Sequence, residues 1–207
     1  MLTGEDGTAI IGGTIRLHPI TPSASKITRQ ATDWTALTIS GGAFQFDGLP
    51  EGSYTLCARV QNSTWLNPCE WNFPTPTATI SRQNPTTNVK IMLKRGAAVP
   101  IRIDDAGRFL AQHEGKTPGA ALLLTVSSPG MFFRLVPLVS QDQKGRDHQI
   151  VVPFNTALTL VVHPSFYNVN AASGLALSKA VSTKIPLLLA PGQQVTPINL
   201  TISGVSN

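Results

Sequence analysis

The sequence has few charged residues and no long apolar run. Asp, Glu, Lys and Arg make up 13% of the 207 residues, about half of the share usual in soluble domains. No apolar segment approaches the ~20 residues of a membrane-spanning helix, and the candidate IPLLLAPG contains Pro186 and Pro191. We therefore expect no transmembrane segment. The opening residues MLTGEDGTAI also lack the basic and apolar regions of a signal peptide, so we interpret the chain as a mature fragment or a shortened form.

Clustered basic residues are missing as well. The net charge of +5 and the isoelectric point near 9.6 would suit an anionic partner. However, the 16 Lys and Arg residues are scattered along the chain, and their only adjacent pair is Lys94-Arg95. The sequence also lacks RNA-binding aromatic motifs and metal-knuckle spacings. We expect no nucleic-acid partner.

The residue groupings that support catalysis or metal binding are absent from the sequence. The four His residues do not occur in a metal-ligand spacing, and no GxSxG motif is present. The acid pairs Glu5-Asp6 and Asp104-Asp105 stand beside glycines, in contexts typical of turns. The sequence therefore predicts no enzyme, no catalytic residue, no metal site and no cofactor.

Cysteine is equally scarce, because the chain contains only Cys57 and Cys69. Their spacing is not CxxC, and no nearby His or second Cys pair completes a zinc site. A disulfide is the favoured interpretation, and closing so short a loop would contribute ~3 kcal/mol. Such a bond implies an oxidising compartment. The alternative is a pair of thiols in a reducing cytosol.

Short alternating runs and turn residues are abundant, by contrast. The 17 glycines and 16 prolines separate runs such as TIRLHPI, WTALTIS, GSYTLCARV, NVKIMLKRG and ALTLVVH, as expected of short strands joined by turns. The stretch FQFDGLPEGSYTLCARV is predicted to form a strand, a tight turn around Pro50-Glu51-Gly52 and a second strand, with Phe44 and Phe46 on one face of the first. The sequence predicts an all-β fold of two tandem antiparallel β-sandwich domains. We place the boundary near Arg95-Gly96, which gives domains of residues 1–95 and 96–207.

The first domain resembles a known family in its motifs GTAIIGGTIRLHPI, GAFQFDGLPEGSYTLCAR and NVKIMLKRG. These segments resemble the carboxypeptidase regulatory-like domain, and the resemblance implies a transthyretin-like (prealbumin-like) β-sandwich. The second domain is only vaguely similar to immunoglobulin-like and prealbumin-like sandwiches. The positions that match the pattern are Gly7, Gly13, Ile15, Gly42, Phe44, Phe46, Leu49, Pro50, Gly52, Tyr54 and Leu56.

The chain departs from that family at its start, because the first strand is nearly missing. The resemblance then implies an exposed sheet edge at Leu2, Thr3 and Gly4. An open edge presents unpaired backbone groups that can pair with another chain. We therefore expect these residues to take part in assembly, with a protein partner or with further copies of the chain.

An aromatic segment, QNSTWLNPCEWNF, follows the second motif. It concentrates Trp65 and Trp71 with Asn67 and Glu70, and exposed aromatic rings beside amide and carboxylate groups are typical of sugar recognition. The segment is thus a candidate polysaccharide-binding site. The alternative is that the Trp side chains cover the end of the core beside the disulfide.

Together these features predict a non-catalytic protein that is secreted or sits on the cell surface or in the periplasm. We expect a scaffold, adhesion or spacer protein within a larger surface assembly. Three alternatives remain: a carbohydrate-binding module that uses Trp65 and Trp71, a strand-exchanging filament subunit, and an accessory domain of a peptidase or outer-membrane transporter.

Overall fold

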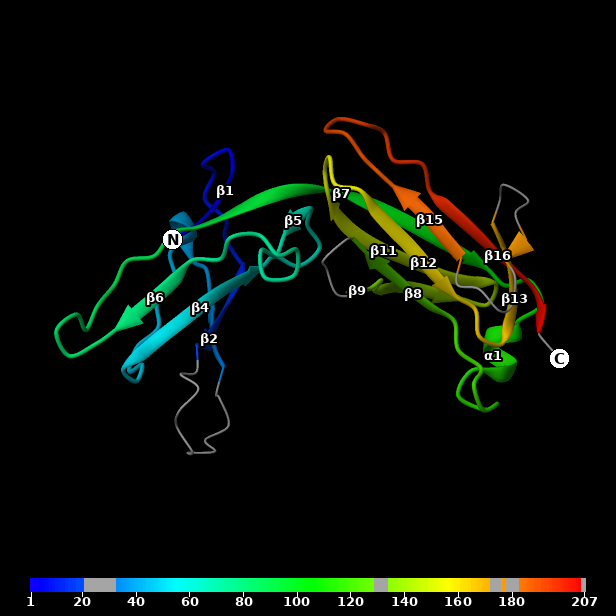
Figure 1. Ribbon diagram of the computed structural model, residues 1–207, viewed down its shortest axis with the longest axis horizontal. Helices are drawn as coiled ribbons and strands as arrows, with labels where there is room; N and C mark the ends of the chain where they lie inside the picture. The colour runs from blue at the N-terminus through cyan, green and yellow to red at the C-terminus, as the bar shows by residue number, and fades with distance from the viewer. Residues whose placement is uncertain (21–32, 129–133, 172–175, 178–182, 206–207) are drawn as a thin grey trace. The chain divides into compact units, whose positions relative to one another are not determined.

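The computed structural model describes residues 1–20, 33–128, 134–171, 176–177 and 183–205. Within these residues the chain forms strands β1 to β16 and two very short helices (Figure 1). The predicted all-β fold is confirmed. The chain divides into two compact units, Met1–Gly96 and Ala97–Asn207, and each is a β-sandwich. The long strand β7 (Ile91–Asp104) contributes residues to both units.

The N-terminal unit has two layers of strands. The larger sheet has the order β3-β2-β4-β6 and is antiparallel throughout. Its strands are β2 (Thr14–Pro19), β3 (Trp34–Leu37), β4 (Gly52–Arg59) and β6 (Thr77–Ile80). In the second layer, β1 (Leu2–Gly4) pairs with β7 in parallel, and β5 (Trp65–Leu66) pairs with it in the antiparallel sense.

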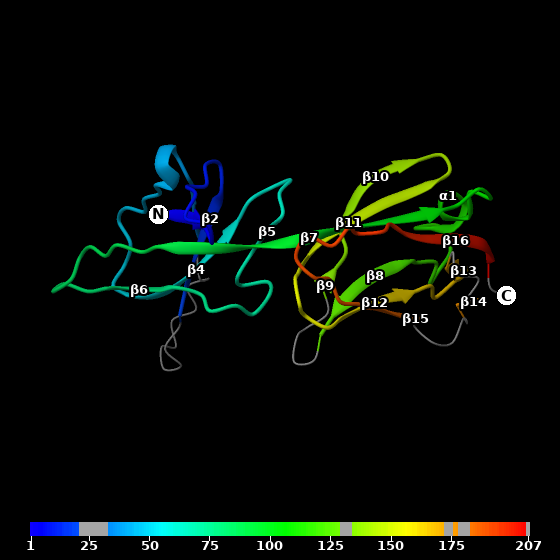
Figure 2. The ribbon, with the colours of Figure 1, turned by 90° about the horizontal axis from the view of Figure 1, so that it is seen from above.

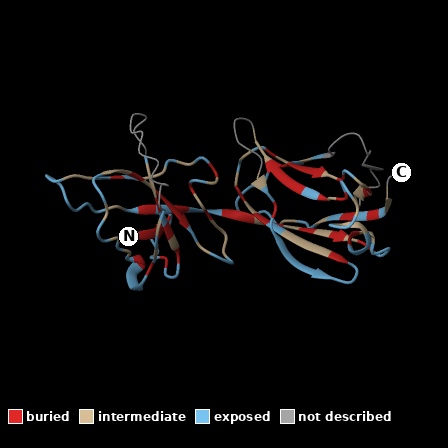
Figure 3. Ribbon diagram, turned by 90° about the horizontal axis from the view of Figure 1, so that it is seen from below, coloured by how far each residue is buried: buried red, intermediate tan, exposed pale blue. Residues whose placement is uncertain are grey.

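Alternation along the strands builds the core of this unit. Ile15 and Leu17 of β2 are 0% and 1% exposed, whereas Arg16 between them faces solvent. Because successive side chains of a strand point to opposite faces, such a pattern buries one face of the sheet. Buried positions lie mainly on the strands (Figure 3). The buried cluster consists of Leu2, Ile10, Ile15, Leu17, Tyr54, Leu56, Ala58, Ala78, Ile91 and Leu93.

The motif FQFDGLPEGSYTL contains one strand where we predicted two. The segment after Pro50 does turn and form β4, which begins at Gly52. Phe44–Phe46 lies outside any strand, so that part of the prediction was wrong. The reason is the lack of a ladder partner: within the described part of the chain, the amides of residues 44–49 donate no backbone hydrogen bond. Alternating Phe residues favour a strand, but a strand needs a neighbour that pairs with it.

The C-terminal unit also has two layers. One sheet has the order β10-β11-β7-β16-β13-β14, and the other has the order β15-β12-β8-β9. The second is antiparallel, whereas β16 pairs with β7 in parallel. The strands are β8 (Leu123–Ser127), β9 (Arg134–Leu135), β10 (Leu138–Asp142), β11 (Gly145–Pro153), β12 (Leu158–His163), β13 (Tyr167–Ala171), β14 (Ala176–Leu177), β15 (Thr183–Leu187) and β16 (Ile198–Val205).

A buried acid explains where the helix of this unit begins. The Asp105 carboxylate accepts hydrogen bonds from the amides of Phe109 at 2.9 Å and Leu110 at 2.8 Å. These bonds satisfy amides that the first turn of a helix leaves unpaired, and α1 (Phe109–His113) follows. The Asp104-Asp105 pair thus lies directly before a turn, as its sequence context indicated. Among the described residues, no helix is long and apolar enough to span a membrane.

Candidate functional site

A groove with a volume of about 860 Å³ opens on the N-terminal unit. We call it the N-terminal groove. Residues of β2, β4 and β6 line it together with two segments outside the sheet, residues 44–49 and 81–90. Its apolar lining consists of Met1, Leu17, Phe44, Phe46, Leu49, Leu56, Ala78, Ile80, Pro85 and Val89.

The groove forms because the second layer of this sandwich covers only part of the larger sheet. That layer begins at Leu2 of β1 and Ile91 of β7. Beyond these positions, the chain that leaves β6 turns and returns to β7 without strand pairing (Figures 1 and 2). The sheet floor at Leu17 and Leu56, which are ladder partners, therefore meets loop segments instead of a strand.

Two phenylalanines give the groove its apolar wall. Phe44 and Phe46 are half-buried, and their rings contact each other edge to face, with centroids 6.2 Å apart. Both pack on the buried cluster of the unit. Apolar side chains that are partly open in a concave surface are typical of interaction sites.

The rim of the groove is polar, and several of its polar groups bond to one another. Arg82 forms an ion pair with Glu51 at 3.0 Å, and the Gln45 amide donates to Asp47 at 2.7 Å. Below the rim, the hydroxyl of the buried Tyr54 donates to the Pro50 carbonyl at 2.6 Å. Burial raises the pKa of this hydroxyl above its ordinary value.

One end of the groove continues the pairing of β1 with β7. The amide of Ile91 donates to the Met1 carbonyl at 2.9 Å. The Met1 nitrogen in turn donates to the Val89 carbonyl at 2.7 Å, and partial burial lowers the pKa of that ammonium group. The ladder therefore reaches Val89, where the groove begins.

The structure places the predicted edge residues Leu2, Thr3 and Gly4 inside the unit, which corrects that prediction. All three are buried. On one side they pair with Ile91–Leu93 of β7. On the other side, the Ile10 amide donates to the Leu2 carbonyl at 3.1 Å, and the Gly4 amide donates to the following turn at 2.8 Å. The turn folds back and covers the edge, so these residues do not offer it to another chain.

The two tryptophans of the predicted sugar site also pack inward. Trp71 is only 5% exposed, so its ring has no open face for a sugar. Trp65 is half-buried, and the guanidinium of Arg95 lies 4.1 Å from its ring centroid. Its other neighbour is Gly4, where even an added methyl group would collide with the ring. The aromatic segment therefore covers the end of the core beside the disulfide, which was the alternative interpretation.

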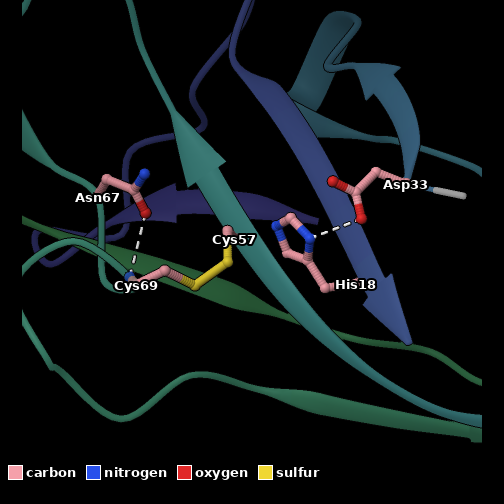
Figure 4. The surroundings of a disulfide bond; sticks show 5 residues. All are labelled: His18, Asp33, Cys57, Asn67 and Cys69. Atoms are coloured by element: carbon pink, nitrogen blue, oxygen red, sulfur yellow. Dashed lines mark hydrogen bonds and ion pairs between the residues drawn. A yellow bond between two sulfur atoms is a disulfide. The ribbon is translucent and has the colours of Figure 1, made fainter. Parts of the chain in front are cut away.

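Cys57 and Cys69 form the expected disulfide, with Cα atoms 5.6 Å apart (Figure 4). Asn67 holds the loop around it, because its side-chain oxygen accepts from the Cys69 amide at 3.1 Å. The backbone amide of Glu70 donates to the Asn67 carbonyl at 3.1 Å. Asn67, one of the polar residues of the predicted sugar site, therefore stabilises the turn beside the disulfide.

A His–Asp pair is the arrangement nearest to acid–base chemistry. His18 of β2 and Asp33, which directly precedes β3, are 2.8 Å apart (Figure 4). Both are substantially exposed, and a surface ion pair of this kind contributes little stability. Within the described ranges, no group of three or more His, Cys, Asp or Glu is arranged to hold a metal ion.

The C-terminal unit carries a charged network around Arg102. Its guanidinium contacts the carboxylates of Asp104 at 3.0 Å, Asp142 at 3.0 Å and Asp147 at 3.2 Å. Hydrogen bonding to Asp104 is the main cause that raises the Arg102 pKa above its ordinary value. The pKa of Asp142 is lowered, chiefly by the Lys144 amide, and that of Asp147 chiefly by the Ser140 hydroxyl. The network joins β7, β10 and β11.

The sequence did not reveal the N-terminal groove. Its most prominent lining residues, Phe44 and Phe46, belong to a motif that indicates core packing. We expected an open edge at β1, whereas the structure covers the opposite sheet at this point with loop segments that line a groove.

Comparisons with known proteins give weak likenesses. No family model matches the chain, and no curated protein matches it. Among solved structures, the minor pilin GBS52 of Streptococcus agalactiae is 13% identical, with 97% of this chain and 87% of that chain covered and a TM-score of 0.37. A streptococcal ancillary pilin is 10% identical, with 96% and 60% covered and a TM-score of 0.41. The pilus adhesin SpaC of Lactobacillus rhamnosus GG is 11% identical, with 99% and 30% covered and a TM-score of 0.29. These values are too low to transfer a function.

Proposed function

We propose that the protein is a non-catalytic scaffold or adhesion protein that works outside the cytoplasm within a larger surface assembly. The observation that carries this proposal is the N-terminal groove. Its apolar walls leave Phe44 and Phe46 partly open. A concave apolar surface of this size calls for a partner that buries it.

The character of the groove favours a protein over a small molecule. Small-molecule sites combine apolar walls with a few polar groups that converge on the ligand. Here four of the rim groups bond in pairs, Arg82 to Glu51 and Gln45 to Asp47. A polar rim around an apolar centre is typical of protein interfaces.

The disulfide supports a location outside the cytoplasm. Cys57–Cys69 joins β4 to the following loop, and such bonds persist in oxidising compartments. A secreted, periplasmic or surface-exposed protein fits this requirement.

We further propose that the N-terminal unit is a carboxypeptidase regulatory-like domain with a transthyretin-like sandwich. Three residues of its motif, Ile15, Tyr54 and Leu56, lie in the buried cluster of the unit. Gly48 of the same motif has a φ of 67°, a conformation that favours glycine. Sugar binding stays a prediction, and the packing of Trp65 and Trp71 does not favour it.

Photocrosslinking on intact cells tests the proposed function. A benzophenone amino acid replaces Phe44 in the groove or, as a matched control, Arg16 on the outer face of β2. We expect the Phe44 position alone to give a crosslinked partner, on protein that a membrane-impermeant biotin reagent also labels. A protein that this reagent does not reach, or whose cysteines are free thiols in the cell, would contradict the proposal.

A further inference from the structure

Basic side chains flank Cys57 on the outer face of the larger sheet of the N-terminal unit. Leu56 and Ala58 belong to the buried cluster of this unit, so Cys57, which lies between them on β4, points to the opposite face. Its ladder partner on β2 is Arg16. Arg59 follows two positions further along β4 and therefore shares this face with Cys57. Both arginines are exposed.

A third basic group, His18, lies on the same face. It stands two positions after Arg16 on β2 and is the ladder partner of Thr55, which makes it a diagonal neighbour of Cys57. Figure 4 shows His18 and the disulfide on these neighbouring strands. Asp33 bonds to His18 at 2.8 Å. Neither arginine takes part in an ion pair with another described residue, so their charges are not offset by such a pair.

The two sulfur atoms of the disulfide differ in access. Cys57 is 8% exposed, whereas Cys69 lies on the surface, next to Glu70 in the chain. An external thiolate therefore reaches the sulfur of Cys69, and Cys57 becomes the leaving group. A leaving thiol departs faster when its thiolate is stabilised, and neighbouring Arg and His side chains stabilise a thiolate. The basic groups thus stand beside the sulfur on which negative charge develops.

We propose that the Cys57–Cys69 bond is a thiol-exchange site whose substrates are small-molecule thiols. A thiolate attacks Sγ of Cys69 and forms a mixed disulfide there, and the electron pair of the broken bond goes to Cys57 as a thiolate. A second thiol attacks the small-molecule sulfur of the mixed disulfide and releases Cys69. The net reaction oxidises two thiols to one disulfide and reduces the protein by two electrons and two protons. This inference goes beyond the proposed function and does not involve the N-terminal groove.

Trapping of the mixed disulfide tests which sulfur is attacked. The full chain is incubated with reduced glutathione, samples are taken over time, and iodoacetamide blocks the free thiols. Peptide mass spectrometry then locates the glutathione. We expect glutathione on Cys69 and the alkyl group on Cys57 of the same molecule. This measurement uses the wild-type protein and needs no variant.

A redox equilibrium tests the role of the basic side chains. The fraction of reduced protein is measured at pH 7 in mixtures of glutathione and glutathione disulfide. In the double variant Arg16→Gln/Arg59→Gln, the equilibrium should shift towards the protein disulfide by at least about threefold, as expected for two unit charges about 7 Å away in water with salt screening. The control Arg82→Gln/Lys90→Gln changes the net charge of the same unit equally and should leave the equilibrium as in the wild type.

Ionisation of Cys57 gives a readout that is independent of the charge on glutathione. In Cys69→Ala, Cys57 is the only thiol, and thiolate absorbance at 240 nm follows its ionisation with pH. We expect Cys57 to ionise at a lower pH in this variant than when Arg16→Gln and Arg59→Gln are added to it. The carboxylates of Asp33 and Glu70 are present in both proteins, so the comparison isolates the two guanidinium groups.

Three results would overturn the inference. A disulfide that glutathione does not reduce would be a structural cross-link only. Glutathione found on Cys57 as often as on Cys69 would contradict the assigned direction of attack. An equilibrium and an ionisation of Cys57 that do not change when both arginines are replaced would show that the basic groups do not stabilise the thiolate. Crosslinking at Phe44 is unaffected by any of these outcomes, so the proposed function is tested separately.

Discussion

Removal of the disulfide should destabilise the N-terminal unit by about 3 kcal/mol. The Cys57–Cys69 bond joins residues separated by 12 positions, and a loop of this length restricts the unfolded chain by about that free energy in the chain-entropy account. We choose the double replacement by Ala, because a single replacement leaves a free thiol. Cys57 is 8% exposed, so a serine there would add the cost of a buried hydroxyl.

Differential scanning calorimetry measures this effect. For a unit of this size, 3 kcal/mol should lower the unfolding midpoint by about 15 °C. Reduction of the wild-type protein should reproduce this shift in the unfolding midpoint. This control distinguishes the effect of breaking the disulfide from the effect of replacing the two side chains. If the variant and the reduced protein both lose less than about 1 kcal/mol, the disulfide does not restrict the unfolded chain as the reasoning requires.

Four further predictions concern stability. Tyr54→Phe removes the hydrogen bond to the turn and should cost about 1 kcal/mol in urea unfolding; a loss below the experimental error would contradict the role of this bond. Asp105→Ala leaves two amides of α1 without their acceptor and should cost about 1–3 kcal/mol, which calorimetry can measure against the wild type. Trp71→Ala should destabilise the unit by about 3–5 kcal/mol, as a core residue does, and a change in glycan binding without loss of stability would instead support a sugar site. The pKa values of Asp142 and Asp147 are lowered in the folded state. The stability that these carboxylates contribute is therefore present above about pH 4 and is lost as the pH falls below it. A thermal unfolding midpoint of Asp142→Asn that falls as steeply as that of the wild type between about pH 4 and pH 2 would contradict this.

Local patterns were sufficient to predict most strands. Ile15 and Leu17 alternate with polar residues, and they lie on one buried face of β2 as this pattern indicates. The turn residues before β4 were equally informative, because Gly48 needs a backbone conformation that few other residues adopt. The disulfide followed from the spacing of the only two cysteines.

The errors arose where a residue's environment depends on distant parts of the chain. Phe44 and Phe46 alternate like strand residues, but no described strand pairs with them. Trp71 resembles a surface platform in a loop rich in polar residues, and it is buried at 5% exposure. In each case the sequence defines the side chain but not the neighbour that covers it.

The sequence by itself determined the all-β class, the disulfide and the turns, because these depend on residue type, alternation and short spacings. Only the tertiary structure decided which edges and faces are open. It closed the edge at β1 through a turn that folds back onto Leu2, and it opened the groove where the layer of β1 and β7 stops at Leu2 and Ile91. Exposure depends on which strands meet, and those pairings join residues that lie about 90 positions apart, as Met1 and Val89 do.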